Sequence, residues 1–262
     1  ERLNSAFENI DIVIHAAALK QVPAAEYNPF EYVKTNVLGT QNIIGAALDN
    51  KVKDVISLST DKASSPINLY GATKLCSDKL ILTASNFKGN KKTNFTVVRY
   101  GNVTGSRGSV IPLFKKINKI KKKLPLTHEK MTRFNISLNS AIDLVKTALK
   151  NKTKNAIFVP KLKSFYIKDL AEAISGKKNN FNIVGIRPGE KIHEELINPA
   201  EARYTVELKN FYIILNAMSE TQIIKFCKLN KCKRVKTSFS YNSGDNKSFM
   251  DIKSLKKIAE KH

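Results

Sequence analysis

Tyr70 and Lys74, in the run Tyr-Gly-Ala-Thr-Lys, are the two residues whose types and spacing first point to chemistry. Because side chains four residues apart lie on the same face of a helix, a phenol and an ammonium would be neighbours there. The lysine charge favours the phenolate and is expected to lower the tyrosine pKa, as a general base for the oxidation of an alcohol requires. Such a pair is common on helix surfaces. Here it closely follows a predicted strand that ends in Ser59–Lys62, and together these residues predict a catalytic site.

An alternation of strands and helices would position these residues. Short apolar runs rich in β-branched residues predict strands at Asp11–Ala18, Val52–Leu58 and Asn94–Tyr100, the first of them buried. The apolar spacing within Pro29–Asn50 and Tyr70–Leu82 predicts helices between them. We expect an α/β fold, a Rossmann-like doubly wound parallel sheet with helices on both faces. Such sheets bind ligands beyond the carboxyl ends of their strands, which here are His15–Lys20, Ser59–Lys62 and Tyr100–Val103.

The glycine-rich turn that binds the pyrophosphate of a dinucleotide is absent from the sequence, since the first glycine, Gly39, falls inside a predicted helix. We therefore expect that the N-terminal phosphate-binding segment is missing from this chain. Gly101, Gly105 and Gly108 have a similar spacing, but they follow a late strand, and we interpret them as a substrate loop. Beyond them the pattern changes to shorter elements with basic linkers, including a surface helix expected at Lys168–Ile174.

The composition excludes several classes of function. The 262 residues suffice for one large domain or slightly more. The formal net charge is +23, but the excess is almost all lysine at predicted surface positions, so we expect neither nucleic acid nor a membrane as partner. Cys76, Cys227 and Cys232 match no zinc or disulfide spacing, which favours a reducing cytoplasm. Five arginines stand apart from the charge runs, in motifs where a guanidinium could hold phosphate or carboxylate: Arg99, Arg107, Arg133, Arg187 and Arg203.

A series of motifs extends this evidence along about four fifths of the chain, to about Leu215. They are His15–Lys20, Glu26–Pro29, Lys34–Asn36, Leu58–Ala63, Asn68–Lys74, Val98–Val103, Ser106–Val110, Met131–Phe134, Ile157–Pro160 and Gly185–Glu194. In this order they resemble the extended short-chain dehydrogenases/reductases, and within them the inverting UDP-N-acetylglucosamine 4,6-dehydratases of pseudaminic acid biosynthesis. The pair Asp61-Lys62 discriminates, because the retaining sugar-nucleotide dehydratases resemble this sequence but carry Asp-Glu there.

The resemblance implies a tightly held NADP that is first oxidant and then reductant within one turnover on UDP-N-acetylglucosamine. Tyr70, assisted by Lys74 and Thr60, would take the proton of the sugar 4-hydroxyl, and the resulting ketone would acidify the C5 hydrogen. Lys62 would then remove the C5 proton while Asp61 protonates the departing 6-hydroxyl. The expected product is a 4-keto-6-deoxy sugar inverted at C5. An acidic Asp and a neutral Lys would require a water-poor pocket that shifts both pKa values.

The resemblance also implies two sets of binding residues. The cofactor would be held by Ala16, Ala17, Ala18, Lys20, Asn36, Tyr70, Lys74, Tyr100, Gly101 and Val103. The substrate would be held by Lys62, Asn102, Arg107, Met131, Thr132, Arg133, Arg187 and Glu190. Simpler readings stand beside these, since His15 could end a core strand and Met131 could only pack. No metal is expected: His193 is followed by two glutamates but lacks ligand spacing, and a solvated helix face is the favoured interpretation.

Other functions remain open on the sequence alone. One is a retaining dehydratase or a 4-epimerase, against which Lys62 argues because a 4-epimerase removes no C5 proton. Another is a fragment that lacks the cofactor-binding glycine loop, binds NADP poorly and is inactive. We expect residues 1–105 to be the remainder of the dinucleotide-binding domain, 106–215 mainly a substrate-binding region, and 216–262 a tail with a short helix. The resemblance implies a homo-oligomer, commonly a hexamer.

Overall fold

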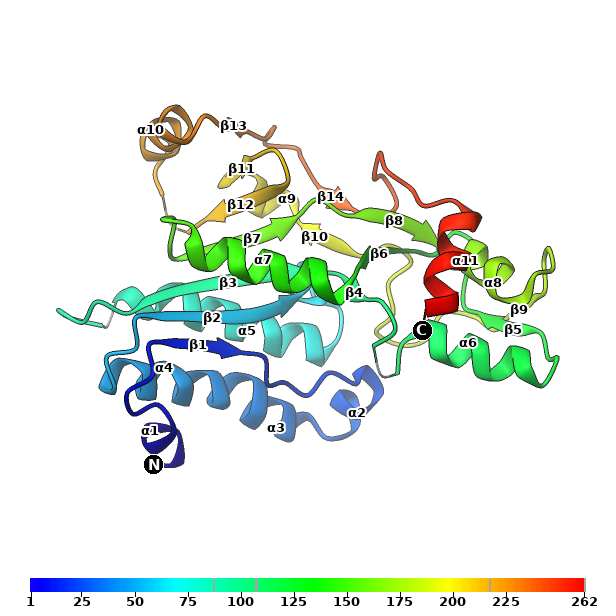
Figure 1. Ribbon diagram of the computed structural model, residues 1–262, viewed down its shortest axis with the longest axis horizontal. Helices are drawn as coiled ribbons and strands as arrows, with labels where there is room; N and C mark the ends of the chain where they lie inside the picture. The colour runs from blue at the N-terminus through cyan, green and yellow to red at the C-terminus, as the bar shows by residue number, and fades with distance from the viewer. Residues whose placement is uncertain (87, 107, 217, 262) are drawn as a thin grey trace. The chain divides into compact units, whose positions relative to one another are not determined.

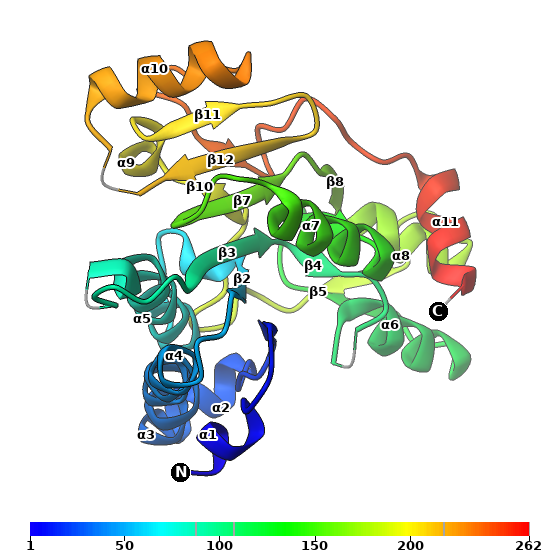
Figure 2. The same cartoon turned by 60° about the vertical axis from the view of Figure 1, so that its left-hand side comes forward.

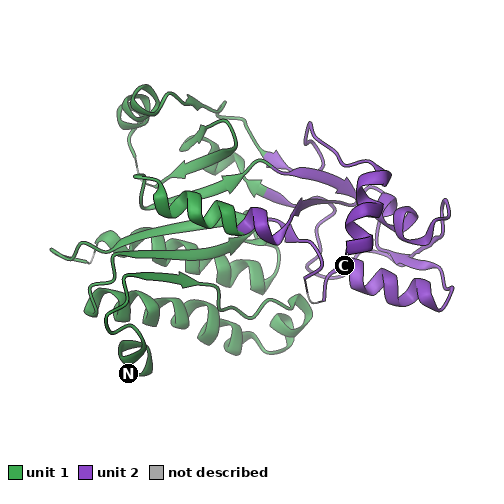
Figure 3. Cartoon of the chain, in the orientation of Figure 1, with its two compact units in different colours: residues 1–100, 142–161, 196–240 green, residues 101–141, 162–195, 241–262 purple. Residues whose placement is uncertain are grey.

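The chain forms two compact units, each assembled from three segments (Figure 3). A computed structural model describes residues 1–86, 88–106, 108–216 and 218–261. Unit 1 comprises residues 1–100, 142–161 and 196–240, and unit 2 comprises residues 101–141, 162–195 and 241–262. The chain therefore passes between the units several times. The expected assignment of residues 1–105 to cofactor binding, 106–215 to substrate binding and 216–262 to a tail uses consecutive segments instead. That functional assignment stays a prediction.

Unit 1 is built on a seven-stranded sheet with the order β1-β2-β3-β7-β12-β11-β13 (Figure 1). Neighbours among the first four strands are parallel, and the remaining neighbours are antiparallel. The strands are β1 (Ile12–His15), β2 (Asp54–Thr60), β3 (Asn94–Tyr100), β7 (Ala156–Pro160), β12 (Phe211–Leu215), β11 (Thr205–Glu207) and β13 (Lys233–Arg234). This parallel core confirms the Rossmann-like α/β fold expected from the sequence.

The first strand differs from the expectation of a buried strand. β1 forms one edge of the sheet and is paired with β2. Val13 and His15 are buried, whereas the alternate side chains Ile12 and Ile14 are 45% and 42% exposed. Successive side chains of a strand point to opposite faces, so β1 buries one face and leaves an apolar row accessible on the other.

Helices cover both faces of the parallel strands. α5 (Leu69–Thr83) contacts β2 and β3. On the other face, the Ile142–Lys150 part of α7 (Leu138–Lys150) packs Leu144 and Ala148 with Ile56 and Val98. Figure 2 shows α4 and α5 on one side of these strands and α7 on the other. The remaining helices of unit 1 are α1 (Arg2–Ala6), α2 (Val22–Tyr27), α3 (Pro29–Tyr32), a π-helical segment (Val33–Leu38), α4 (Gly39–Asp49), α9 (Pro199–Ala202), α10 (Glu220–Asn230) and 3-10 turns at Asp61–Ala63 and Ala84–Asn86.

Unit 2 has its own apolar core around short strands and three helices. β6 pairs with β4 and β8, and β5 pairs with β9. Phe114, Leu124, Leu126 and Leu170 are fully buried in its core. Its elements are β4 (Asn102–Val103), α6 (Val110–Lys119), β5 (Leu124–Leu126), β6 (Thr132–Ile136), β8 (Lys163–Tyr166), α8 (Ile167–Ser175), β9 (Phe181–Ile183), β14 (Tyr241–Asn242) and α11 (Ile252–Lys261), with β10 (Glu195–Ile197) at the boundary between the units.

Two helices expected in the later part of the chain are present. The helix expected at Lys168–Ile174 is α8, which is amphipathic and buries Leu170 and Ala171 on one face. α11 is the short helix expected in the C-terminal tail. Within the described ranges, the structure has no helix with the length and apolarity needed to cross a membrane, and Cys76, Cys227 and Cys232 are free thiols.

Candidate active site

The turn after β2 carries the acid–base pair of unit 1. The strand ends at Thr60, and Asp61–Ala63 follows as one 3-10 turn. The side chain of Asp61 is 1% exposed, and its Oδ1 lies 3.0 Å from Lys62 Nζ. The Thr60 hydroxyl donates to the same oxygen at 3.0 Å. Thus one carboxylate oxygen receives an ammonium and a hydroxyl donor in a mostly buried setting.

The start of α5 lies directly against this turn. The side chain of Asn68 caps the helix by accepting from the Gly71 backbone N–H at 2.8 Å. A Cβ at Gly71 would collide with the Lys62 carbonyl oxygen, so only glycine permits this approach. The cap and the glycine therefore place Tyr70 beside the turn, with Tyr70 and Lys74 both largely buried.

The electrostatics of Tyr70 differ from the expectation. Burial raises the pKa of Tyr70, while the charge of Lys62 and a hydrogen bond with Thr60 act in the opposite direction. The expected lowering of the tyrosine pKa by Lys74 is therefore wrong: the opposing lysine is Lys62, and burial outweighs it. Burial also lowers the pKa of Lys74, against the charge of Asp78. Helical spacing correctly indicated a shared face, but it contains no information about desolvation.

A buried charge network continues from Lys74. The carboxylate of Asp78 accepts from the Ser59 hydroxyl at 2.7 Å and from Arg99 Nη2 at 3.2 Å. Arg99 is 0% exposed, and its Nη1 also donates to both carboxylate oxygens of Glu201 at 2.8 and 2.9 Å. Asp78 and Glu201 were not expected from the sequence. Asp78 could have been found, because it lies one helical turn beyond Lys74 on the same face.

The loop after β1 is held by polar contacts at its base. His15 ends the strand in the core, as the simpler reading proposed, with Nε2 3.1 Å from Thr40 Oγ1. Burial and the charge of Lys74 lower its pKa from 6.5 to about 4. The Asn36 side chain, from the π-helical segment, accepts from Leu19 N–H and donates to Leu19 C=O, both at 2.9 Å. The neighbouring residues expected to bind a cofactor are exposed: Ala16, Ala17, Ala18 and Lys20.

Unit 2 contains a cavity of about 230 Å³ that collects most of the expected substrate-binding residues. Arg133 is held there by carboxylates, with Nη2 3.6 Å from Glu190 Oε1 and Nε 3.7 Å from Glu194 Oε1. The lining also includes Asn102, Val103, Met131 and Arg187. Met131 both lines the cavity and packs in the core of unit 2.

Three further expected binding residues lie outside this cavity description. Arg107 lies outside the described residues. Of the last expected cofactor residues, Tyr100 ends β3 in unit 1, and Gly101 is buried in unit 2.

Thr132 and His193 have structural surroundings that the sequence did not indicate. Thr132 does not line the cavity; its hydroxyl lies 2.8 Å from His193 Nδ1 and 2.8 Å from Ser243 Oγ. The expected solvated helix face at His193 is wrong, because the segment is a loop in which His193 is half-buried and Glu194 is buried. A Cβ at Gly244 would come within 2.7 Å of the His193 ring, so this loop is closely packed.

Comparisons with known proteins show which family this chain belongs to. The family model described as polysaccharide biosynthesis protein matches residues 1–216. A Campylobacter jejuni protein named UDP-N-acetylglucosamine 4,6-dehydratase (inverting) is 47% identical over 98% of this chain and 78% of its own length. A UDP-glucose 4-epimerase of Rickettsia rickettsii is 44% identical over 81% of this chain and 63% of its own length. The solved structure of Pen from Bacillus thuringiensis has 39% identity and a TM-score of 0.86, covering 100% of this chain and 78% of that one. The resemblance to the inverting dehydratases is thereby confirmed.

Proposed function

The chain belongs to the polysaccharide biosynthesis protein family, and from this premise we propose that it is a nucleotide-sugar dehydratase that converts UDP-N-acetylglucosamine into a 4-keto-6-deoxy sugar inverted at C5. The observation that carries the proposal is the pair formed by buried Asp61 and partly buried Lys62, 3.0 Å apart and beside Tyr70. The 47% identical Campylobacter jejuni protein with the name of this activity supports the choice of substrate.

The proton count of the Asp61–Lys62 pair fits an elimination. Removal of the C5 proton requires a neutral Lys62 amine, and departure of the 6-hydroxyl as water requires a protonated Asp61. When both transfers are complete, the lysine is an ammonium and the aspartate a carboxylate, which is the ion pair that this geometry accommodates. The two charge states contain the same number of protons. The pair can therefore pass between them by moving one proton across a 3.0 Å contact, with no proton drawn from solvent.

Tyr70 would remove the proton of the sugar 4-hydroxyl. Its raised pKa disfavours the phenolate, the form that accepts the proton, and the Lys62 charge and the Thr60 hydrogen bond are the groups that favour it. Burial excludes water from the phenol, which strengthens both of these interactions. Lys74, on the next turn of α5, would bind and orient a ligand.

Unit 1 contains residues that would hold part of a nicotinamide dinucleotide, although the glycine-rich turn for its pyrophosphate is absent from the sequence. Among the residues that the structure describes, the buried Lys74 ammonium makes no hydrogen bond, so its donors are available to ribose hydroxyls. The exposed residues Ala16–Ala18, which precede the Leu19 backbone that the buried Asn36 anchors, form the adjoining surface that would hold it. When bound, NADP would supply the redox chemistry, accepting hydride from C4 of the sugar and returning it at C6.

The cavity of unit 2 would bind the UDP part of the substrate. Arg133 and Arg187 would contact the diphosphate, because a planar guanidinium matches phosphate oxygens in pairs. Glu190, half-buried and close to Arg133, would accept hydrogen bonds from the ribose. Met131 and the apolar residues of the same lining would cover the uracil ring.

A 4-epimerase is the competing function, because the Rickettsia rickettsii relative has that name. Epimerisation at C4 requires oxidation and reduction at the same carbon and leaves the C5 proton in place. A lysine held 3.0 Å from a buried carboxylate would then have no reaction to perform. The Asp61–Lys62 pair therefore favours dehydration.

The test is an NMR time course of UDP-N-acetylglucosamine with the protein and NADP in deuterated water. We expect a 4-keto-6-deoxy product with deuterium at an inverted C5, formed at least about a hundredfold more slowly by Lys62→Ala. Lys53→Ala is the matched control, because Lys53 forms a 3.1 Å pair with Asp11 that is exposed to solvent. A C4 epimer without deuterium would support the epimerase, and full activity of Lys62→Ala would refute the assigned role of the lysine.

A further inference from the structure

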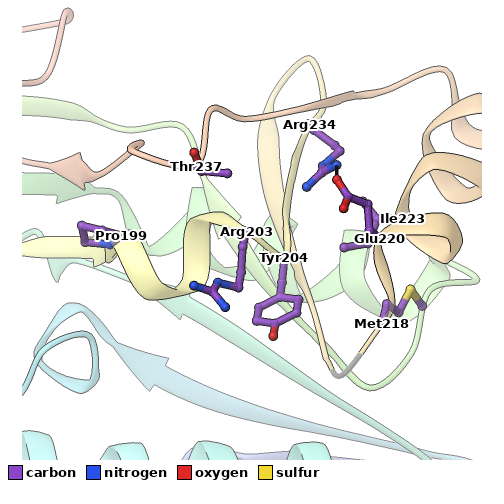
Figure 4. A pocket seen from close by; sticks show the side chains of 8 residues that line it. All are labelled: Pro199, Arg203, Tyr204, Met218, Glu220, Ile223, Arg234 and Thr237. Atoms are coloured by element: carbon purple, nitrogen blue, oxygen red, sulfur yellow. Dashed lines mark hydrogen bonds and ion pairs between the residues drawn. The ribbon is translucent and has the colours of Figure 1, made fainter.

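A second cavity, of about 310 Å³, lies in unit 1 and contains none of the residues assigned above (Figure 4). Its lining comes from α9 and the segment that follows it, from α10 and Met218 before it, and from the strand β13 and Thr237 after it. The lining residues are Pro199, Arg203, Tyr204, Met218, Glu220, Ile223, Arg234 and Thr237. Its volume lies at the lower end of the range of small-molecule sites, roughly 300–1,000 Å³.

One wall of this cavity is apolar and belongs to the fixed core of unit 1. Ile223 is 1% exposed and is a member of the core cluster that also contains Val206 and Leu215. Tyr204 and Met218 pack against the same cluster. Because these side chains pack against the core cluster, we expect the wall to keep its shape when a ligand binds. The Tyr204 ring is an aromatic face on which a ligand ring can stack.

The charged groups of the cavity are unequal in number. Arg234 Nη1 lies 2.6 Å from Glu220 Oε1, and Figure 4 shows this ion pair as a dashed line. The Arg203 guanidinium lines the same cavity and has no hydrogen bond or ion pair with any residue in the described part of the chain. The lining therefore holds two guanidinium groups and one carboxylate. Exposed lysines at 231, 233 and 236 add to the positive potential around it.

We propose that this cavity binds a small phosphomonoester carried on a ring. Arg203 would engage the phosphate through its planar fork of donors, which pairs with phosphate oxygens two at a time. Arg234 would add a second positive charge while Glu220 fixes its orientation. The ring would rest against Tyr204 and the apolar wall. The proposal is independent of the dehydratase function, because none of its residues is assigned to that reaction.

The three methionines of the chain allow both cavities to be observed in one experiment. Met218 lines the cavity of unit 1, Met131 lines the cavity of unit 2, and Met250 lines neither. In protein labelled with ¹³C at the methionine methyl groups, the probes would be UMP, glucose 6-phosphate and inorganic phosphate through the millimolar range. We expect saturable movement of the Met218 signal with both phosphomonoesters, stronger for UMP because its aromatic ring stacks on Tyr204, and a weaker response to inorganic phosphate.

Variants of the exposed Arg203 test the assignment without disturbing the core. Arg203→Gln should weaken binding at the Met218 signal about ten- to hundredfold, and Arg203→Lys should fall between this variant and the parent protein. Arg2→Gln removes an exposed arginine from α1 of the same unit and should leave binding unchanged. Absence of a Met218 response to every probe, or an undiminished response in Arg203→Gln, would overturn the proposal. The Met131 signal reports the proposed nucleotide cavity separately, so failure of either hypothesis is distinguishable from failure of the other.

Discussion

Replacement of Glu201 by Gln tests whether the buried charge network holds unit 1 together. Arg99 is 0% exposed and donates to the two Glu201 oxygens at 2.8 and 2.9 Å, while the Glu201 side chain is 16% exposed. The glutamine would leave the buried guanidinium with Asp78 as its single carboxylate partner. Loss of one partner from a buried ion pair costs about 3–5 kcal/mol. Because the amide oxygen can still accept one hydrogen bond, we expect the lower end, about 3 kcal/mol.

The assay is urea unfolding followed by circular dichroism, with Glu207→Gln as the matched control. Glu207 forms an even shorter pair with Lys161, at 2.6 Å, but the two side chains are 44% and 32% exposed. Exposed pairs contribute about 0–1 kcal/mol because water and salt screen them. Similar losses of unfolding free energy for the two variants would refute the argument, since distance rather than burial would then determine the contribution.

Two further predictions concern backbone space and pH. Gly71→Ala should lower the unfolding free energy by about 1–3 kcal/mol, because the new Cβ would meet the Lys62 carbonyl oxygen. Gly45→Ala, in α4, should raise the unfolding free energy by about 0.5–1 kcal/mol, because its Cβ would have nothing within 4 Å. Urea unfolding measures both changes, and equal effects of the two variants would contradict the steric explanation. Because the pKa of His15 is lowered to about 4, the unfolded chain takes up this proton near pH 6.5 while the folded protein resists it, so stability should fall as the pH drops from about 6.5 to 4. NMR titration of His15 checks the value, and a His15→Asn variant with an unchanged pH profile of unfolding would contradict the assignment.

Local patterns were sufficient to predict much of the parallel core. The strand expected at Asn94–Tyr100 has these same bounds, and the helix expected at Tyr70–Leu82 is α5, Leu69–Thr83. Both are determined by signals within a few residues: a β-branched apolar run in the first, and a capping Asn68 before an apolar period in the second. The placement of Asp61 and Lys62 at a strand end follows from the same local reasoning.

Features that depend on distant residues could not be predicted. Glu201 lies 102 positions from Arg99 in the sequence, yet the two side chains are in direct contact. The interleaving of the two units likewise depends on which segments pack together in three dimensions. The sign of the pKa shift at Tyr70 is the third example, because it depends on how deeply the phenol is buried, and spacing along a helix does not determine that.

Lys74, Asp78, Arg99 and Glu201 form a series of alternating charges, and this alternation explains how unit 1 tolerates them in its interior. Burial raises the pKa of Asp78, and the charge of Arg99 is the largest effect that opposes it, followed by that of Lys74. Arg99 and Lys74 together carry two positive charges, whereas Asp78 carries one negative charge. Glu201 supplies the second negative charge and restores neutrality. Without Glu201, the guanidinium and the ammonium would share one buried carboxylate, and the interior of unit 1 would hold an unbalanced positive charge. A residue outside the catalytic turn thus completes the charge balance around Lys74, the residue proposed above to contact a ligand.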